Sequence, residues 1–350
     1  MIKMYTPNET THNLFAMCKP NGMLAKALYS GRKVVFLSCT LLLAVASITW
    51  TIYLWIPIEA WRKFYAMIYS SYLMIFGAIV SSVYSNRDKY MDCFAYFEVN
   101  ANINIISPSL VKYLQKNRFI ISILLSVGFF CYTVAGIVAF VQFGGDSIWY
   151  LIIRTSSLAC YYLYLNFYVE SCLYVQCCFI QVEHQIDAVN NSNSLLSLAK
   201  VRQVRRCYCI AIKTTEKLNS LLLPATVTFF VLSLIDCHYV FTNVLAFPSL
   251  VIILMFIAAF TNFFVVTYYI IYINHLAVNV YEKVYSFSFK TESLNVSKEI
   301  QLLLTRIARA DVGLTWLGIF VITPTCVTSL ATITLTVALA VPTLIKFIGF

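Results

Sequence analysis

Few residues of this chain have the types and spacing that catalysis or metal binding requires. The sequence contains four His, and His238 has no second ligand three or four positions away, where a helix would present one. Asp236 lies two positions before His238 and so points away from it on a helix. The adjacent Cys177 and Cys178 have no partner at zinc-site spacing, and no phosphate-binding glycine loop, dinucleotide fingerprint or HExxH motif occurs. The sequence therefore predicts no enzyme, no metal site and no cofactor.

Ionisable side chains within apolar segments are the second kind of candidate, because a charge inside a membrane is costly and usually marks a site. Arg154 lies about six residues, or ~9 Å, into one such segment. Asp236 and His238 lie close to the end of the next, which runs in the opposite direction, so we expect all three side chains at one depth. Together with Tyr162, on the same segment as Arg154, they form a candidate ligand-binding site.

Aromatic residues near these groups would supply the walls of a pocket, since small-molecule cavities combine apolar walls with a few polar groups. The candidates are Tyr72, Tyr132, Tyr161 and Tyr164. Two plainer interpretations stay open: Arg154 and Asp236 form a structural ion pair, or the Arg154 side chain extends to the membrane surface. Glu170, near the other end of the same segment, is expected to be solvated or paired.

The composition places these residues in a membrane protein. Charged residues make up 11% of the 350 residues, against roughly 25% in soluble proteins, and the mean hydropathy is +0.78. The pI of about 9.0 comes from basic residues that flank apolar segments. Such residues set the orientation in the membrane and face anionic lipid, so we expect lipid contacts and no nucleic-acid partner.

Seven segments are long and apolar enough to cross ~30 Å of hydrocarbon as helices. They comprise residues 34–56, 64–84, 119–143, 148–175, 218–244, 250–273 and 313–345. The sequence thus predicts an all-α membrane protein with seven transmembrane helices.

Long polar connections alternate with short ones, and the basic residues indicate which set is cytoplasmic. The long set, which carries 21 Lys and Arg against 3 in the short set plus the C-terminal tail, comprises segments 1–33, 85–118, 184–217 and 274–312. Because Lys and Arg concentrate on the cytoplasmic side, we predict a cytoplasmic N-terminus and an extracellular C-terminus. This orientation is opposite to that of a G-protein-coupled receptor and argues against that class.

The domain organisation follows from this topology. We predict a cytoplasmic N-terminal segment, 1–33, and one seven-helix domain, 34–350. Within 184–217 and 274–312, apolar residues recur at near-helical spacing among charged ones. We expect helices there, which either lie on the membrane surface or extend the fourth to seventh spans into the cytoplasm.

The closing segment, 313–345, is predicted to be a helix with a polar face suited to lining a path across the membrane. That face is formed by Thr325, Thr328, Thr332, Thr334 and Thr336.

Seven spans with a cytoplasmic N-terminus, long inner loops and tight outer loops resemble the insect gustatory and odorant receptor superfamily. The residues from Leu314, LTWLGIFVITPTCVTSLATITLTVAL, are similar to the Leu…Gly-x-Phe-x-Ile run of gustatory receptors. In that family a span follows that opens with Thr-Tyr, five apolar residues and Gln-Phe. Aligned on Thr334, this chain keeps the Thr and the apolar run but has Leu335, Val341 and Pro342 at the Tyr, Gln and Phe positions. The chain thus resembles a divergent gustatory receptor.

This resemblance implies a taste-type chemosensory receptor of the plasma membrane that is itself a ligand-gated, non-selective cation channel. It implies a tetramer of this chain, or of this chain with related subunits, and a small-molecule pocket on the outer side. The last span of each subunit would line the pore, with Thr332 and Thr336 wetting it and Leu335 or Leu339 narrowing it. The alternative is a seven-span receptor, scaffold or transporter without its own pore, although transporters tend to show internal repeats and none is evident here.

Overall fold

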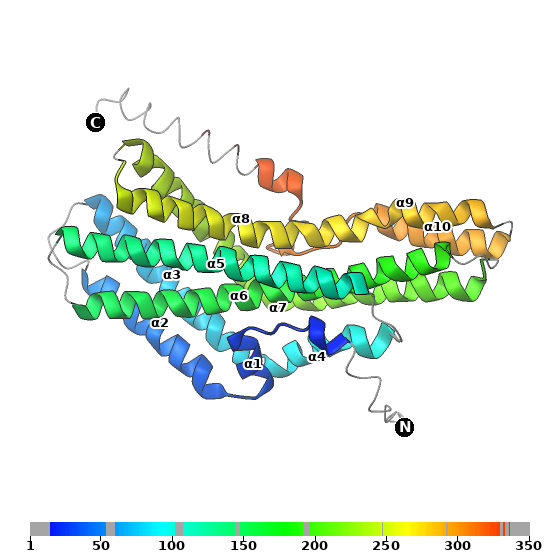
Figure 1. Ribbon diagram of the computed structural model, residues 1–350, viewed down its shortest axis with the longest axis horizontal. Helices are drawn as coiled ribbons and strands as arrows, with labels where there is room; N and C mark the ends of the chain where they lie inside the picture. Colours follow the sequence, from blue (N-terminus) through cyan, green and yellow to red (C-terminus); the bar gives the residue numbers. More distant parts are fainter. Residues whose placement is uncertain are drawn as a thin grey trace.

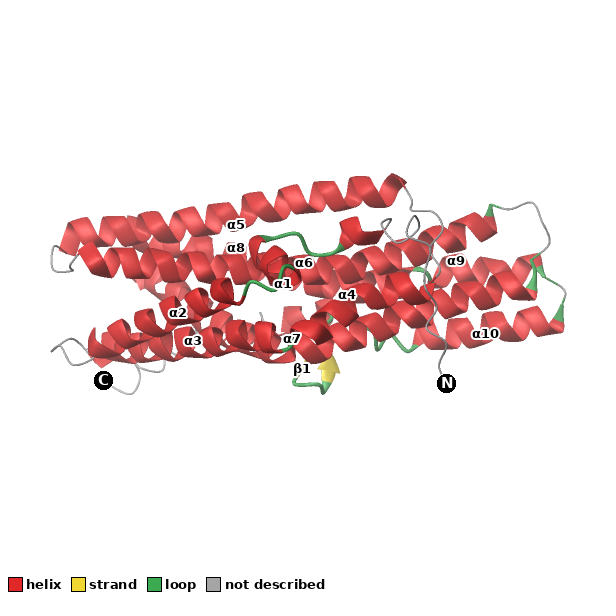
Figure 2. Ribbon diagram, turned by 90° about the horizontal axis from the view of Figure 1, so that it is seen from below, coloured by secondary structure: helices red, strands yellow, loops and turns green. Residues whose placement is uncertain are grey.

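The computed structural model describes residues 15–53, 60–101, 108–143, 148–191, 196–246, 248–291 and 293–329, together with Thr332 and Thr336. Its main elements are long helices that lie side by side (Figure 1). They are α2 (Lys33–Tyr53), α3 (Ala60–Ser85), α5 (Pro108–Phe143), α6 (Ile148–Asn190), α7 (Leu198–Ala246) and α8 (Leu250–Asn279). Figure 2 shows α2 and α3 along one half of the bundle, with α10 (Leu294–Ala308) at the other end.

Shorter elements complete the described fold. They are the 3-10 helices η1 (Phe15–Cys18) and η2 (Ser286–Lys290), the helices α1 (Met23–Tyr29), α4 (Arg87–Ala101) and α9 (Tyr281–Tyr285), and the strands β1 (Thr315–Trp316) and β2 (Phe320–Val321).

Apolar length and composition qualify five helices of the described chain to cross a membrane: α2, α5, α6, α7 and α8. This agrees with the prediction of a helical, multi-pass membrane protein. The second predicted span falls in α3, and most of the seventh lies outside the described residues.

Helix α6 lies at the centre of the bundle. In its most apolar window 83% of the residues are buried, against 28% in the corresponding windows of α2 and α5. A helix that is surrounded by protein can carry polar and aromatic side chains that bond to its neighbours, whereas α2 and α5 present wide apolar faces outward. The candidate residues Arg154 and Tyr162 are therefore on the most enclosed of the candidate spans.

Helix α7 joins the C-terminal part of the predicted helical extension 184–217 to the predicted fifth span in one continuous element, which contains Pro224. Near its N-terminal end, Arg202 and Arg205 each place Nε 2.9 Å from a carboxylate oxygen of Glu299 on α10. The Glu299 side chain is buried, so these ion pairs fix α10 against α7.

The closing segment differs from the predicted helix at its start. Strands β1 and β2 pair antiparallel there, with Trp316 opposite Phe320, and helical residues begin only at 324. The central turn residues Leu317 and Gly318 have φ of 53° and 74°, and the amide of Ile319 donates to the Trp316 carbonyl at 2.9 Å. Two successive positive φ values are the signature of a tight hairpin turn, which a helix cannot contain.

The hairpin is held to α7 by one side chain. Asn219 accepts a hydrogen bond from the Thr315 amide at 2.8 Å and donates to the Thr315 hydroxyl at 2.9 Å. Trp316 also packs against Phe230 of α7, with ring centroids 5.8 Å apart. The start of the closing segment is thus attached to the middle of α7.

Candidate functional site

Three helices approach closely around the predicted site residue Tyr162. The Tyr162 hydroxyl accepts a hydrogen bond from Nδ2 of Asn262 on α8 at 2.7 Å, and both side chains are buried. Gly128 of α5 leaves the room for this pair, because a Cβ at that position would lie 2.6 Å from the Tyr162 hydroxyl and 2.8 Å from Asn262 Oδ1. The glycine therefore allows α5, α6 and α8 to meet at this point.

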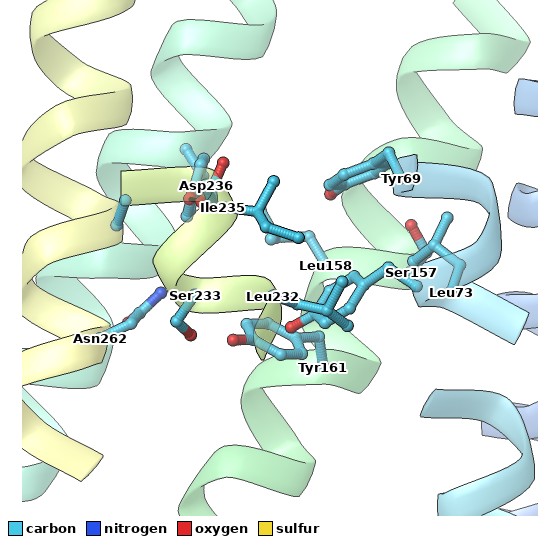
Figure 3. Close-up of a pocket in the computed structure, with 13 residues that line it drawn as sticks. Tyr69, Leu73, Ser157, Leu158, Tyr161, Leu232, Ser233, Ile235, Asp236 and Asn262 are labelled. Carbon is cyan, nitrogen blue, oxygen red and sulfur yellow. Dashed lines mark hydrogen bonds between the residues drawn. The ribbon is translucent and has the colours of Figure 1, made fainter. Parts of the chain in front are cut away.

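A cavity lies beside this crossing, between α3, α5, α6, α7 and α8 (Figure 3). Its walls contain the tyrosines Tyr69, Tyr72, Tyr132 and Tyr161. Its polar groups are Ser157, Ser233, Asp236 and Asn262. The volume open to the centre of a water-sized sphere is ≈ 60 Å³, which is room for a few waters.

The Asp236 carboxylate is bound by one of these tyrosines. The Tyr132 hydroxyl on α5 donates to Asp236 Oδ2 on α7 at 2.6 Å, a short distance typical of a bond to an ionised acceptor. This bond joins two helices across the cavity and turns the Tyr132 ring into part of its wall.

Arg154 lines a second, larger cavity of ≈ 210 Å³ on the same measure. The two cavities share Tyr69, Tyr132 and Leu158 as a common wall. Other walls of the larger cavity are Trp50, Ala139, Tyr239, Val240, Val251, Ile252 and Met255. This shared wall, which contains two tyrosines, separates the larger cavity with Arg154 from the smaller cavity with Asp236.

The four predicted binding residues have different outcomes. Arg154 and Asp236 line adjoining cavities, but no ion pair within 4.0 Å joins these two described residues. Tyr162 stands behind the smaller cavity as the partner of Asn262. His238 is in neither lining, because it lies two positions from Asp236 and points to another side of α7.

Several lining residues were absent from the sequence-based site. Tyr69, Trp50 and Asn262 fall in other apolar segments, and nothing in one sequence reveals the rotation of each helix about its axis. A polar Asn within an apolar segment was the available signal for Asn262, because such residues usually bond to a neighbouring helix. Tyr69 had no comparable signal among 24 tyrosines.

The predicted pore residues are only partly described. Thr332 and Thr336 are exposed, and their hydroxyls donate to the carbonyls of Thr328 and Thr332 at 2.9 and 2.8 Å. Leu335 and Leu339 lie outside the described residues.

Replacing Tyr132 with Phe should lower the thermal unfolding midpoint of the protein in detergent, because Asp236 loses a charge-assisted hydrogen bond worth about 1.5–3 kcal/mol. Tyr268→Phe is the matched control, since the Tyr268 side chain on α8 is exposed and its hydroxyl makes no hydrogen bond to another described residue. Equal shifts for the two variants would contradict the role assigned to the Tyr132 hydroxyl.

Comparisons with known proteins give matches among solved structures. No family model and no curated protein sequence matches the chain. The structure of the insect olfactory receptor OR5 from Machilis hrabei is similar with a TM-score of 0.62 and 14% sequence identity, over 95% of this chain and 96% of that chain. The structure of the same receptor in complex with eugenol gives 0.64 and 13% over the same shares. These neighbours are receptors rather than enzymes, and at this identity the likeness establishes the fold.

Proposed function

We propose, from the premise that this chain has the fold of the insect chemoreceptors, that it is a chemosensory receptor of the plasma membrane and a ligand-gated cation channel. In this proposal the chain crosses the membrane seven times, with a cytoplasmic N-terminus and an extracellular C-terminus. Four copies, or this chain with related subunits, surround a pore formed by the closing segment. The receptor is of the taste type.

The two adjoining cavities carry the ligand-binding part of the proposal. In the proposed orientation they lie toward the outer side, enclosed by six helices and lined by aromatic side chains with a few polar groups. One solved neighbour with the same fold is a complex with eugenol, a small aromatic molecule. We assign ligand binding to Arg154 and Asp236, with Tyr162 supporting the wall and His238 lying nearby.

The threonines of the closing segment support a pore function. Thr328, Thr332 and Thr336 recur every four residues, so they share one face of a helix, and all three are exposed. Each hydroxyl donates to a carbonyl one turn earlier, which leaves its oxygen able to accept from water. A hydroxyl stripe of this kind is unfavourable against lipid and favourable beside water. Leu335 and Leu339 are assigned the narrowing of the pore, since apolar rings gate by dewetting.

Exposed apolar side chains at the α10 end of the bundle support an assembly of several subunits. Phe289 of η2 is 77% exposed, and Leu294 and Leu302 of α10 are exposed as well. Clusters of this kind mark protein or membrane contacts.

The oligomeric state of the purified full-length protein tests whether it is a tetrameric channel. A four-fold particle whose closing helices surround the symmetry axis is the expected result of single-particle imaging. A monomer would contradict the channel and favour the seven-span receptor or scaffold without its own pore.

Replacing Leu339 with Ser should raise the ligand-free conductance of cells that express the protein, because a hydroxyl ring would wet an apolar constriction. Whole-cell current at equal surface expression is the measurement. Leu41→Ser, on the exposed outward face of α2, is the control and should leave the resting current unchanged. An unaltered leak in Leu339→Ser would remove Leu339 from the proposed gate.

A further inference from the structure

The guanidinium of Arg154 is a charge at membrane depth with no carboxylate partner in the described chain. The ion pairs of the described residues involve other groups, and no hydrogen bond from the Arg154 side chain to a described residue is present. A cation that has left bulk water is costly unless an anion compensates it. Among the described residues that line the cavity with Arg154, none carries a negative charge to compensate it.

Small residues on α5 make room for this cation. A Cβ at Gly136 would lie 3.3 Å from Arg154 Cζ and 3.4 Å from one of its terminal nitrogens, so the guanidinium rests against bare backbone. Ala139, one turn further along α5, lines the same cavity. The guanidinium therefore lies against the backbone of α5 beside the cavity.

Asp236, the acidic residue that lines the smaller cavity, is hydrogen-bonded by a tyrosine and makes no ion pair with Arg154. Asp236 lies across the shared wall of Tyr69 and Tyr132, and it accepts the short hydrogen bond of Tyr132. Tyr69 lines both the cavity that contains Arg154 and the cavity that contains Asp236. Of the described residues that line the larger cavity, Arg154 alone carries a formal charge.

We propose that the ligand of this receptor is a small organic anion, a carboxylate on an aromatic or aliphatic body, whose carboxylate binds Arg154. The proposal rests on the ligand-binding function assigned above. A guanidinium presents two parallel N–H groups that match the two oxygens of a carboxylate. The body of the ligand would pack on Trp50, Leu158 and Met255, which line the same cavity.

Three single-ring probes that differ in charge test this class: benzoate, the neutral benzamide and the cationic benzylamine. Their affinities are measured by titration calorimetry on the full-length protein in detergent micelles at pH 7. We expect benzoate to bind roughly 10- to 100-fold more tightly than benzamide, which corresponds to one charge-assisted bidentate pair. Equal affinity for benzoate and benzamide would overturn the proposal, as would tighter binding of benzylamine that is lost in Asp236→Asn.

Two variants of Arg154 test whether this residue causes the preference for benzoate over benzamide. Arg154→Gln should abolish the preference for benzoate, whereas Arg154→Lys should retain part of it because the charge remains but the fork is lost. Arg206→Gln removes the same charge at an exposed position of α7 far from the cavities and should bind benzoate as the parent does. Benzoate binding that persists unchanged in Arg154→Gln would overturn the proposal.

These measurements test the anion-binding proposal and the channel proposal independently of each other. Calorimetry needs no pore, so benzoate binding without any evoked current would contradict the channel and keep the anion assignment. Currents evoked by benzamide in a protein that does not bind benzoate would contradict the anion assignment and keep the channel. Unfolding midpoints of each variant show whether the binding was measured on folded protein, and Arg154→Lys supplies the readout if Arg154→Gln does not fold.

Discussion

Replacing Gly128 with Ala is expected to lower the stability of the protein by about 3 kcal/mol, because overpacking at a close helix crossing costs 1–3 kcal/mol and a buried hydrogen bond is lost as well. The added Cβ would lie 2.6 Å from the Tyr162 hydroxyl, so Tyr162 and Asn262 must separate. Both sit behind the cavity wall, and ligand affinity should fall together with the unfolding midpoint in detergent.

Two other helix glycines supply the controls. A Cβ at Gly77 would meet its nearest atom, Leu43 Cβ, at 3.6 Å, which is ordinary contact. Gly77→Ala should therefore be neutral, or stabilising by up to ~1 kcal/mol through helix propensity. Gly136→Ala, where the nearest atom lies at 3.3 Å, should fall between them. A series in which all three variants behave alike would show that the close crossing at Gly128 does not limit stability.

Replacing Glu170 with Leu should release the N-terminal segment from the bundle. Glu170 is buried, pairs with Arg118 at 3.8 Å and accepts a hydrogen bond from the amide of Asn21. Arg118 in turn donates to the Lys19 carbonyl at 2.6 Å, and Lys19 pairs with Glu98 at 3.2 Å. Removing one partner of a buried pair costs about 3–5 kcal/mol, because the other charge stays buried without compensation.

Limited proteolysis and amide exchange of residues 15–22 are the measurements, and both should increase in Glu170→Leu. Arg118→Met combined with Glu170→Leu should restore part of the stability, since both charges are then absent. Asp88→Asn is the matched control, because its pair with Arg87 is at 3.7 Å and the Asp88 side chain is 98% exposed. Unchanged exchange of residues 15–22 in Glu170→Leu would show that apolar packing alone holds the segment.

The sequence predicted a helical membrane protein, and five of the predicted spans lie in helices long and apolar enough to cross a membrane, because hydrophobic length depends only on local composition. Glu170 was predicted to be solvated or paired, and the structure pairs it. Packing of the N-terminal segment was missed: Phe15 lies in a polar stretch, yet its ring is buried 5.2 Å from that of Phe97 and 5.9 Å from that of Tyr174. Contacts between residues so distant in the chain leave no periodic pattern.

The sequence predicted a common depth for Arg154 and Asp236, and in the structure these residues line adjoining cavities. The tyrosines shared by the two cavities depend on how α3 and α5 are rotated about their axes, which the sequence does not reveal. The hairpin was missed because Thr315 and Trp316 suit an apolar helix as well as a strand. The positive φ of Leu317 decides between the two, and composition does not encode it.

Because α7 is one continuous helix, a movement beside the cavities can reach the start of the closing segment through it. Asp236 and Asn219 lie on this one helix about 17 residues apart, or ~26 Å. A tilt of the half of α7 that carries Asp236 would be transmitted as far as Pro224, where the missing amide hydrogen removes one backbone bond and the helix can bend. Asn219 lies just beyond Pro224 and binds Thr315. The stiffness of the turn that contains Pro224 would thus set how much of a movement beside the cavities reaches the hairpin.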